Sequence, residues 1–233
     1  MLAFLVSRRT EARLVRLVLL ALLVTLVVAF FVPIGRATRR EKVLASADVQ
    51  RIATALAQFY IDLRRFPACS GEDCSRVAGI GRSANNKLTF LAVGDRRGDL
   101  SRWYPRESPS LVIRWQLAAN EDRQTPERNN AYYHLVTNDP NVDGVGDRRD
   151  YPHEDHLAWR GPYVTQLGFD PWGRTYIVSV GAMEANGRPV APGARGWILS
   201  AGPNGVLETA PDASVLGGDD IGMIVDGTSR VEP

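Results

Sequence analysis

The sequence predicts an α+β protein in which one long N-terminal helix packs on a small antiparallel β-sheet. Three observations lead to this fold class: an apolar run at residues 17–34, an amphipathic segment at residues 37–65, and two β-rich runs at residues 175–180 and 196–201. The chain has 233 residues, of which 45% are hydrophobic and 23% are charged. This composition is typical of a folded domain and excludes disordered and collagen-like chains.

The apolar run, LVLLALLVTLVVAFFVPI, predicts a membrane anchor. A helix of about 18 residues at about 1.5 Å per residue spans roughly 27 Å, close to the hydrocarbon thickness of about 30 Å. A cleavable signal peptide would have a shorter apolar core, followed by a cleavage site of small residues. We therefore expect residues 17–36 to stay in the protein as a transmembrane anchor.

Basic residues lie on both sides of this anchor, so the positive-inside rule does not decide its orientation. They are Arg8, Arg9, Arg13 and Arg16 before the anchor and Arg36, Arg39, Arg40 and Lys42 after it. The two cysteines of the chain, Cys69 and Cys74, suit a small disulfide loop in an oxidising compartment, and a reduced pair without a role is the alternative. We therefore expect a cytoplasmic basic flank at residues 1–16 and an extracytoplasmic domain at residues 37–233.

Residues 37–66 are expected to form an amphipathic helix, because their apolar residues recur at intervals of three and four. These residues are Val43, Val49, Ile52, Leu56, Phe59, Tyr60 and Leu63. Pro67 should end the helix. Since only Pro33 and Gly35 interrupt the pattern between the anchor and this segment, we predict one long kinked helix with a transmembrane half and an amphipathic half.

The rest of the domain divides into a loop-rich variable region at residues 68–158 and a sheet region at residues 159–225. The first is rich in Gly, Asn, Asp, Arg and Pro, and its apolar stretches at residues 88–93 and 111–117 predict short elements between loops. In the second, TYIVSV and GWILSA are separated by turn-forming residues. They predict antiparallel strands of a small sheet.

An acidic loop in the variable region, DPNVDGVGDRRD, matches most positions of the twelve-residue calcium loop. Gly144 stands at the sixth position, and Asp replaces the usual final Glu. Gly146 and the absence of clear flanking helical patterns argue against a full EF-hand, and a solvated turn is the alternative. The predicted calcium ligands are Asp139, Asn141, Asp143, Asp147 and Asp150.

Three passages occur in order along the chain: ALAQFYIDLRRFP, then WRGPYV followed by DPWGRTYIV, then SAGPNG followed by GGDDIG. Together they resemble the major pseudopilin of the type II secretion system, the G subunit, over most of residues 17–67 and 159–225. The resemblance implies a pilin-like fold, anchored in the bacterial inner membrane with its C-terminal domain in the periplasm. It further implies helices that stack into a short filament, through contacts with lipid, other pseudopilins and the inner-membrane secretion platform.

The resemblance also implies a calcium ion between the SAGPNG loop and the acidic segment that follows it. By matching motifs, its ligands would be the backbone carbonyl of Ala201 and the side chains of Asn204, Asp219 and Asp220. Asn204 stands where the family usually has aspartate, and the spacer at residues 206–216 is longer than usual. An ordinary Asx turn with solvated acids is therefore the alternative.

The N-terminus departs from the pattern of processed pilin-like precursors. Glu11 stands near the expected glycine of the cleavage site, and Arg16 stands where an acidic residue is expected in the apolar helix. An arginine there would repel a free N-terminal amine. We therefore expect a divergent member without the prepilin peptidase motif, whose N-terminus stays uncut.

Other classes of function find less support in the sequence. His153 and His156 lack a third metal ligand at helical spacing, and no G-x-S-x-G motif or phosphate-binding glycine loop occurs, so we expect no enzyme. Basic residues of the domain alternate with acids, which argues against nucleic-acid binding. The alternative to a filament subunit is a stand-alone, membrane-anchored periplasmic binding or assembly-factor module that does not polymerise.

Overall fold

The computed structural model describes residues 39–67, 90–115, 126–154, 156–182 and 195–225, together with the single residues 20, 88 and 117. The chain separates into two compact units, Met1–Glu41 and Lys42–Pro233, and the fold below is that of the second unit. The predicted basic flank, the predicted anchor apart from Leu20, and the predicted disulfide of Cys69 and Cys74 lie outside the described residues. Across the ranges that the structure describes, no helix has both the length and the apolar character needed to cross a membrane.

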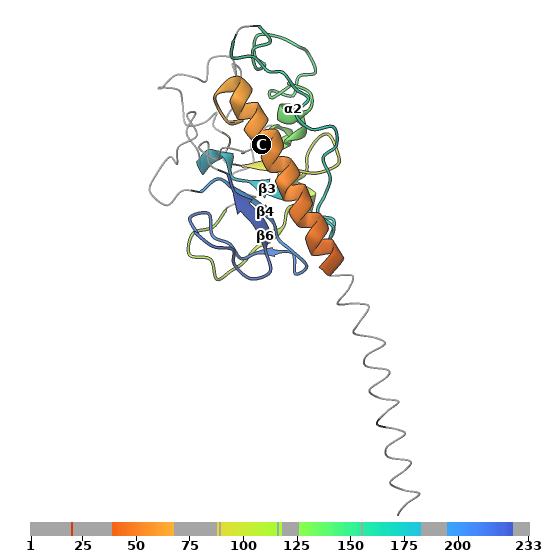
Figure 1. The fold of residues 1–233 in the computed structure, drawn as a ribbon, viewed down its shortest axis with the longest axis vertical. Coiled ribbons are helices and arrows are strands. Elements are labelled where there is room, and N and C mark those ends of the chain that lie inside the picture. The colour runs from red at the N-terminus through yellow and green to blue at the C-terminus, as the bar shows by residue number, and fades with distance from the viewer. Residues whose placement is uncertain are drawn as a thin grey trace, which may run out of the picture. The chain divides into compact units, whose positions relative to one another are not determined.

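A long helix covers residues 39–63 and confirms the helix predicted from the apolar spacing (Figure 1). Its buried residues follow the expected three-and-four period and are Ala45, Val49, Ile52, Ala55, Leu56, Phe59 and Leu63. Val43 does not fit this period, because it lies on the opposite side of the helix from Ala45, and it is 64% exposed. The expectation that Val43 belongs to the buried stripe was therefore wrong.

The main sheet has four antiparallel strands in the order β1-β3-β4-β6. The strands are β1 (Leu91–Val93), β3 (Tyr176–Val178), β4 (Trp197–Ser200) and β6 (Ile221–Ile224). The two strands predicted from TYIVSV and GWILSA are confirmed as β3 and β4. The sheet also takes β1 from the region predicted to be loop-rich, so the predicted boundary at residue 159 does not separate the sheet from the loops.

Short elements complete the domain. A two-stranded parallel pair joins β2 (Arg106–Glu107) to β5 (Val206–Leu207). The described residues also contain one turn of α-helix, α2 (Tyr132–Leu135), and the 3₁₀ turns η3 (Ser101–Trp103), η4 (Pro126–Asn129) and η5 (Val180–Ala182). The described part of the stretch predicted as an element at residues 111–117 has no regular secondary structure.

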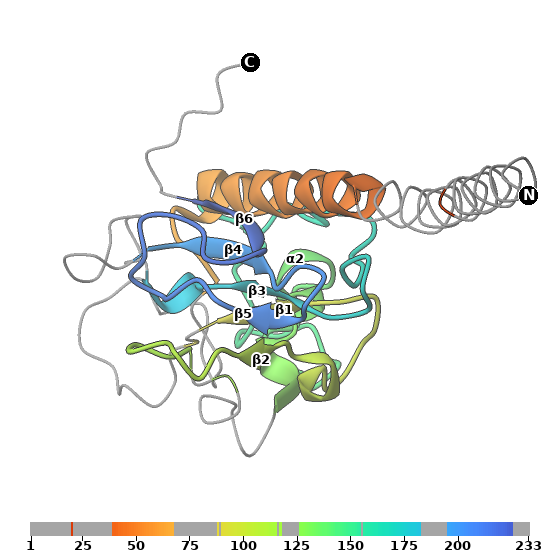
Figure 2. The same ribbon diagram turned by 90° about the horizontal axis from the view of Figure 1, so that it is seen from below.

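Strands β1, β3 and β4 are buried on both faces, whereas β6 at the edge of the sheet is only partly buried. The long helix lies along one side of the sheet (Figure 2). Alternate residues of a strand point to opposite faces, so Tyr176 and Val178 pack with the long helix while Ile177 packs on the other side. The second face is covered by irregular chain and by β5. Its covering residues include Leu100, Trp103, Tyr104, Trp115, Leu117 and Leu207. The sheet is thus the middle layer between a helix and a layer of loops.

Candidate functional site

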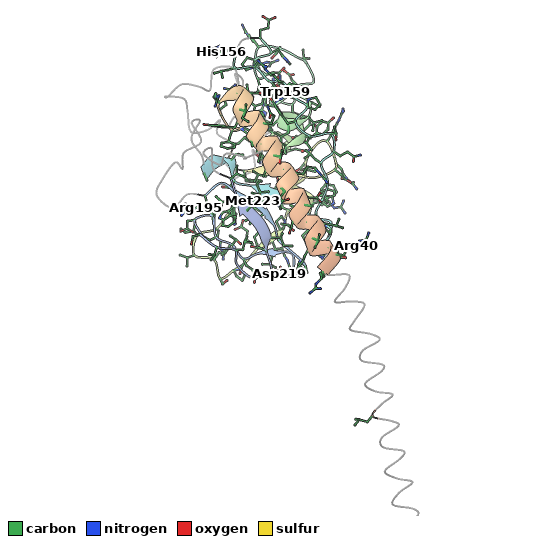
Figure 3. All side chains as sticks on the ribbon, in the orientation of Figure 1. Arg40, His156, Trp159, Arg195, Asp219 and Met223 are labelled. Atoms are coloured by element: carbon green, nitrogen blue, oxygen red, sulfur yellow. The ribbon has the colours of Figure 1, made fainter. Side chains whose placement is uncertain are left out.

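Two groups of oxygen-bearing side chains coincide with the sites predicted from the sequence. We call the first the C-terminal cluster, formed by Asn204, Glu208, Asp219 and Asp220, and the second the Asp139–Asp150 loop. Asp219 lies at one end of the domain in Figure 3, and His156, which follows the Asp139–Asp150 loop in sequence, lies at the opposite end.

The C-terminal cluster forms where the loop after β4 meets the loop before β6. The backbone N–H of Asn204 donates to Asp219 Oδ2 at 3.2 Å, and the amide Nδ2 of Asn204 donates to Glu208 Oε2 at 2.9 Å. The backbone N–H of Asp219 also donates to Glu208 Oε2, at 3.2 Å. These bonds bring together two of the predicted residues, Asn204 and Asp219, and add Glu208, which the sequence analysis missed.

The two loops approach each other closely at Gly202. Its φ of +59° is unfavourable for residues with a side chain, and a Cβ placed there would lie 2.2 Å from the carbonyl oxygen of Asp219. The loop after β4 is further held by Arg174, whose Nη1 donates to the carbonyl of Gly202 at 3.1 Å. Backbone packing therefore sets the position of the acidic segment relative to Asn204.

Asp220 is 6% exposed, and its Oδ2 accepts hydrogen bonds from the backbone N–H groups of Glu208 at 2.9 Å and Thr209 at 2.7 Å. Burial raises the pKa of the Asp220 carboxyl above its usual value. Within the described residues, Asp219 Oδ1 and Asp220 Oδ1 are buried and have no hydrogen-bond partner. A buried carboxylate oxygen without a donor is costly, and a bound cation would remove that cost.

Asn204 and Ala201 were also predicted as ligands of the calcium ion, but Asn204 Oδ1 is already hydrogen-bonded and Ala201 is buried. Asn204 Oδ1 accepts a hydrogen bond from the backbone N–H of Val206 at 2.7 Å, which is the Asx turn considered as the alternative. Ala201 is fully buried directly after β4. As the described side chains stand, no three Asp, Glu, His or Cys residues are arranged to hold a metal ion.

The Asp139–Asp150 loop is folded around its own aspartates. Asp139 accepts hydrogen bonds from the backbone N–H groups of Asp143 at 3.1 Å and Gly144 at 3.2 Å. Gly144 has a φ of +73°, which fits the sharp turn that a calcium loop needs at its sixth position. The structure therefore brings the first, fifth and sixth positions of the predicted pattern into one turn.

The last predicted ligand of this loop, Asp150, is 1% exposed, and its Oδ2 accepts from the backbone N–H of Asp147 at 2.9 Å. Burial, reinforced by the charges of Asp139, Asp147 and Asp143, raises the pKa of Asp150 to about 6. Burial likewise raises the pKa of Asp139. The other three acids of the pattern therefore all disfavour the charged form of Asp150.

Arg149 supplies positive charge inside this loop. Its Nη2 lies 2.6 Å from Asp147 Oδ2 and also contacts Asp143 Oδ2, and its Nε donates to Asp147 Oδ2 at 2.8 Å. These contacts lower the pKa of Asp147. The predicted ligands Asp143 and Asp147 thus already have a cationic partner.

An open cavity of about 290 Å³ lies beside this loop, lined in part by Arg97, Tyr132, Tyr133, Asn138, Asp139 and His153. Asn138 Nδ2 lies 2.9 Å from His153 Nε2, which ties this histidine to the residue directly before the loop. A third histidine, His134, is fully buried, with its ring nitrogens 2.7 Å from the Tyr151 hydroxyl and 2.8 Å from the carbonyl of Arg128. Burial lowers the pKa of His134 to about 4, so it is a neutral member of the core at neutral pH.

Comparison with known proteins adds no relative. The chain matches no protein-family model, no curated protein and no solved structure. The function is therefore argued from the fold, the two oxygen-rich groups and the sequence resemblance described above.

Proposed function

We propose that this chain is a pseudopilin-like structural subunit of a type II secretion filament or a related type IV pilus-like filament. It is anchored in the bacterial inner membrane by residues 17–36 and carries a periplasmic C-terminal domain. The observation that carries the proposal is the long helix at residues 39–63, which packs along one face of a four-stranded antiparallel sheet. The protein acts by assembly through this helix and not by chemistry on a substrate.

The outward side of the helix supports this function. Val43 and Leu44 are 64% and 48% exposed at the start of the helix, and Ile61 is 53% exposed near its end. Exposed apolar side chains on a helix suit packing against a neighbouring helix. Val43 and Leu44 are also the first apolar residues of this helix after the apolar run in sequence.

Cross-linking tests the filament. Val43→Cys is made in a chain in which Cys69 and Cys74 are replaced by serine, in membranes that contain the partner secretion proteins. Arg114→Cys is the matched control, because Arg114 is exposed on the loop layer that covers the other face of the sheet. We expect cross-linked ladders with Val43→Cys and not with Arg114→Cys. Monomers in both variants would favour the stand-alone binding module instead.

Calcium at the C-terminal cluster is the second part of this proposal. The oxygens that suit the ion are Asp219 Oδ1 and Asp220 Oδ1, with Glu208 beside them, because carboxylates are the ligands that calcium prefers. When bound, the ion would neutralise the acids and join the loop after β4 to the loop before β6. It would stabilise the domain and take no part in a reaction.

Thermal unfolding of the full chain, with and without calcium, tests this cluster. At a calcium concentration about 100 times the dissociation constant, one site adds about 2.7 kcal/mol to the free energy of unfolding. We expect Asp219→Asn to lose the contribution of this cluster. Asp212→Asn, at an exposed aspartate of the same spacer, should keep it. Equal calcium effects in the two variants would contradict a site at the C-terminal cluster.

A further inference from the structure

The Asp139–Asp150 loop contains two buried oxygens that the fold leaves unsatisfied. Asn141 is 6% exposed and Asp150 is 1% exposed. Neither Asn141 Oδ1 nor Asp150 Oδ1 has a hydrogen-bond partner in the parts of the chain that the structure describes. The other polar atoms of these side chains are used, since Asn141 Nδ2 donates to Asp143 Oδ2 at 2.9 Å and Asp150 Oδ2 accepts from the Asp147 N–H.

These two oxygens stand at the third and twelfth positions of the calcium pattern, which normally supply ligands. They come from opposite ends of the loop, and contacts within the loop link these ends. Asn141 Nδ2 and Arg149 Nη2 both contact Asp143 Oδ2, Arg149 also contacts Asp147, and the Asp147 N–H donates to Asp150. An unsatisfied buried acceptor is destabilising, because it has lost its bonds to water and gained none in the fold. Two of them in a loop with three further aspartates, Asp139, Asp143 and Asp147, favour a cation as the missing partner.

The loop also stores backbone strain. Val142, at the fourth position, has a φ of +58°, a conformation that β-branched residues rarely adopt. Strain of this kind persists where the surrounding contacts hold it, and it is common in ligand-binding loops. Here the Asp139 carboxylate holds the turn through the N–H groups of Asp143 and Gly144.

We propose that the Asp139–Asp150 loop binds a calcium ion through Asp139, Asn141, Asp143 and Asp150, and that the ion displaces the Arg149 guanidinium from Asp143. Arg149 then acts as an internal counter-charge that keeps the loop folded when calcium is absent. The inference does not depend on the proposed filament function, because it rests on the atoms of this loop alone. The expected affinity is that of extracellular calcium modules, about 10⁻⁴ to 10⁻³ M.

The first test is a calorimetric titration of the full chain with calcium. The second is a titration with terbium, a calcium substitute whose luminescence is excited through the neighbouring Tyr151. Asp143→Asn is the first variant, because Asp143 is exposed and its replacement leaves the core unchanged. We expect it to weaken binding to this loop about tenfold or more, the effect of losing one charged ligand. Asp219→Asn is the matched control and should keep the terbium signal of this loop.

The variant Arg149→Gln distinguishes two interpretations of this loop: a calcium site, and a turn whose acids are neutralised by arginine alone. If calcium competes with Arg149, this variant binds calcium as well as or more tightly than the wild type. If the loop is only an arginine-neutralised turn, the variant loses stability and gains no calcium binding, which would overturn the proposal. Loss of all calcium binding in Asp219→Asn would also overturn it. If Asp143→Asn does not fold, the wild-type protein provides the test through the amide NMR signals of Gly144 and Val145. We expect these signals to shift on addition of millimolar calcium. Unchanged signals would overturn the proposal.

Discussion

Strands β1, β3 and β4 of the central sheet are buried on both faces, but one face is covered by a regular helix and the other by irregular chain. On the helix side, the burial repeats with the helical period, and Phe59 contacts the rings of Tyr151 and Tyr163 at centroid distances of 5.0 and 5.4 Å. On the loop side, burial depends on large residues from separate segments, such as Trp115 and Leu207. A helix satisfies its own backbone, whereas irregular chain needs side-chain hydrogen bonds to remain packed.

The largest expected effect is on the helix side. Phe59→Ala removes a fully buried ring from the contact between helix and sheet, and a change of this kind lowers the free energy of unfolding by about 4 kcal/mol. Chemical denaturation of the full chain in mild detergent measures it. Ile61→Ala, at an exposed position of the same helix, should change stability by less than about 0.5 kcal/mol. Similar losses in the two variants would mean that the helix does not cover the sheet in this register.

The second effect is the pH dependence of the helix-side core. His134 bonds to Tyr151, which packs on Phe59. The pKa of His134 falls from 6.5 in the unfolded chain to about 4 in the fold, so the unfolded chain binds the proton more tightly. Stability from the neutral ring is present above pH 6.5 and is lost as the pH falls toward 4, by roughly 3 kcal/mol in full.

His134→Gln keeps a hydrogen-bonding side chain and removes this titration. Measured between about pH 7.5 and 4, its unfolding free energy should fall less steeply than that of the wild type. The comparison between the two proteins cancels the contributions of other groups, including Asp150. Parallel curves would contradict a buried neutral His134.

The smallest of the three effects is on the loop side. Trp115 Nε1 donates to the carbonyl of Thr209 at 2.8 Å, which joins residues far apart in the sequence. Trp115→Phe keeps most of the ring and leaves that buried carbonyl without this donor, at a cost of about 1–2 kcal/mol. Val112→Ala, on the same segment and 98% exposed, serves as the control and should have no measurable effect. If Trp115→Phe leaves the free energy of unfolding unchanged, the loop layer is held by the burial of apolar area and not by this hydrogen bond.

The helix and two strands were predictable because their patterns are local. The spacing of Val49, Ile52 and Leu56 identifies the buried face of the helix without knowledge of its partner. The loop layer was not predictable, because Leu100, Trp115 and Leu207 follow no common period. Strand β1 was predicted only as a short element, since its pairing with β3 joins residues more than 80 positions apart in the chain.

Of the two candidate sites, one could be found from a local sequence pattern and the other was only partly predictable. The aspartates of the Asp139–Asp150 loop could be found from their spacing, because a twelve-residue loop is a local pattern. Arg149 was not recognised as their partner, although two arginines lie inside the motif. Glu208 could not be assigned to the C-terminal cluster, because only the course of the chain between β5 and β6 brings it to Asn204 and Asp219.

By itself, the sequence determined the long helix, the face that it buries, strands β3 and β4, and the positions of both acidic loops. Only the tertiary structure decided that the second face of the sheet is covered, that Glu208 joins Asn204, and that Asn141 and Asp150 keep buried oxygens without a donor. The physical reason is that periodicity along a chain records which side of an element avoids water. Contacts between distant segments depend on strand pairing and backbone approach, which no local pattern specifies.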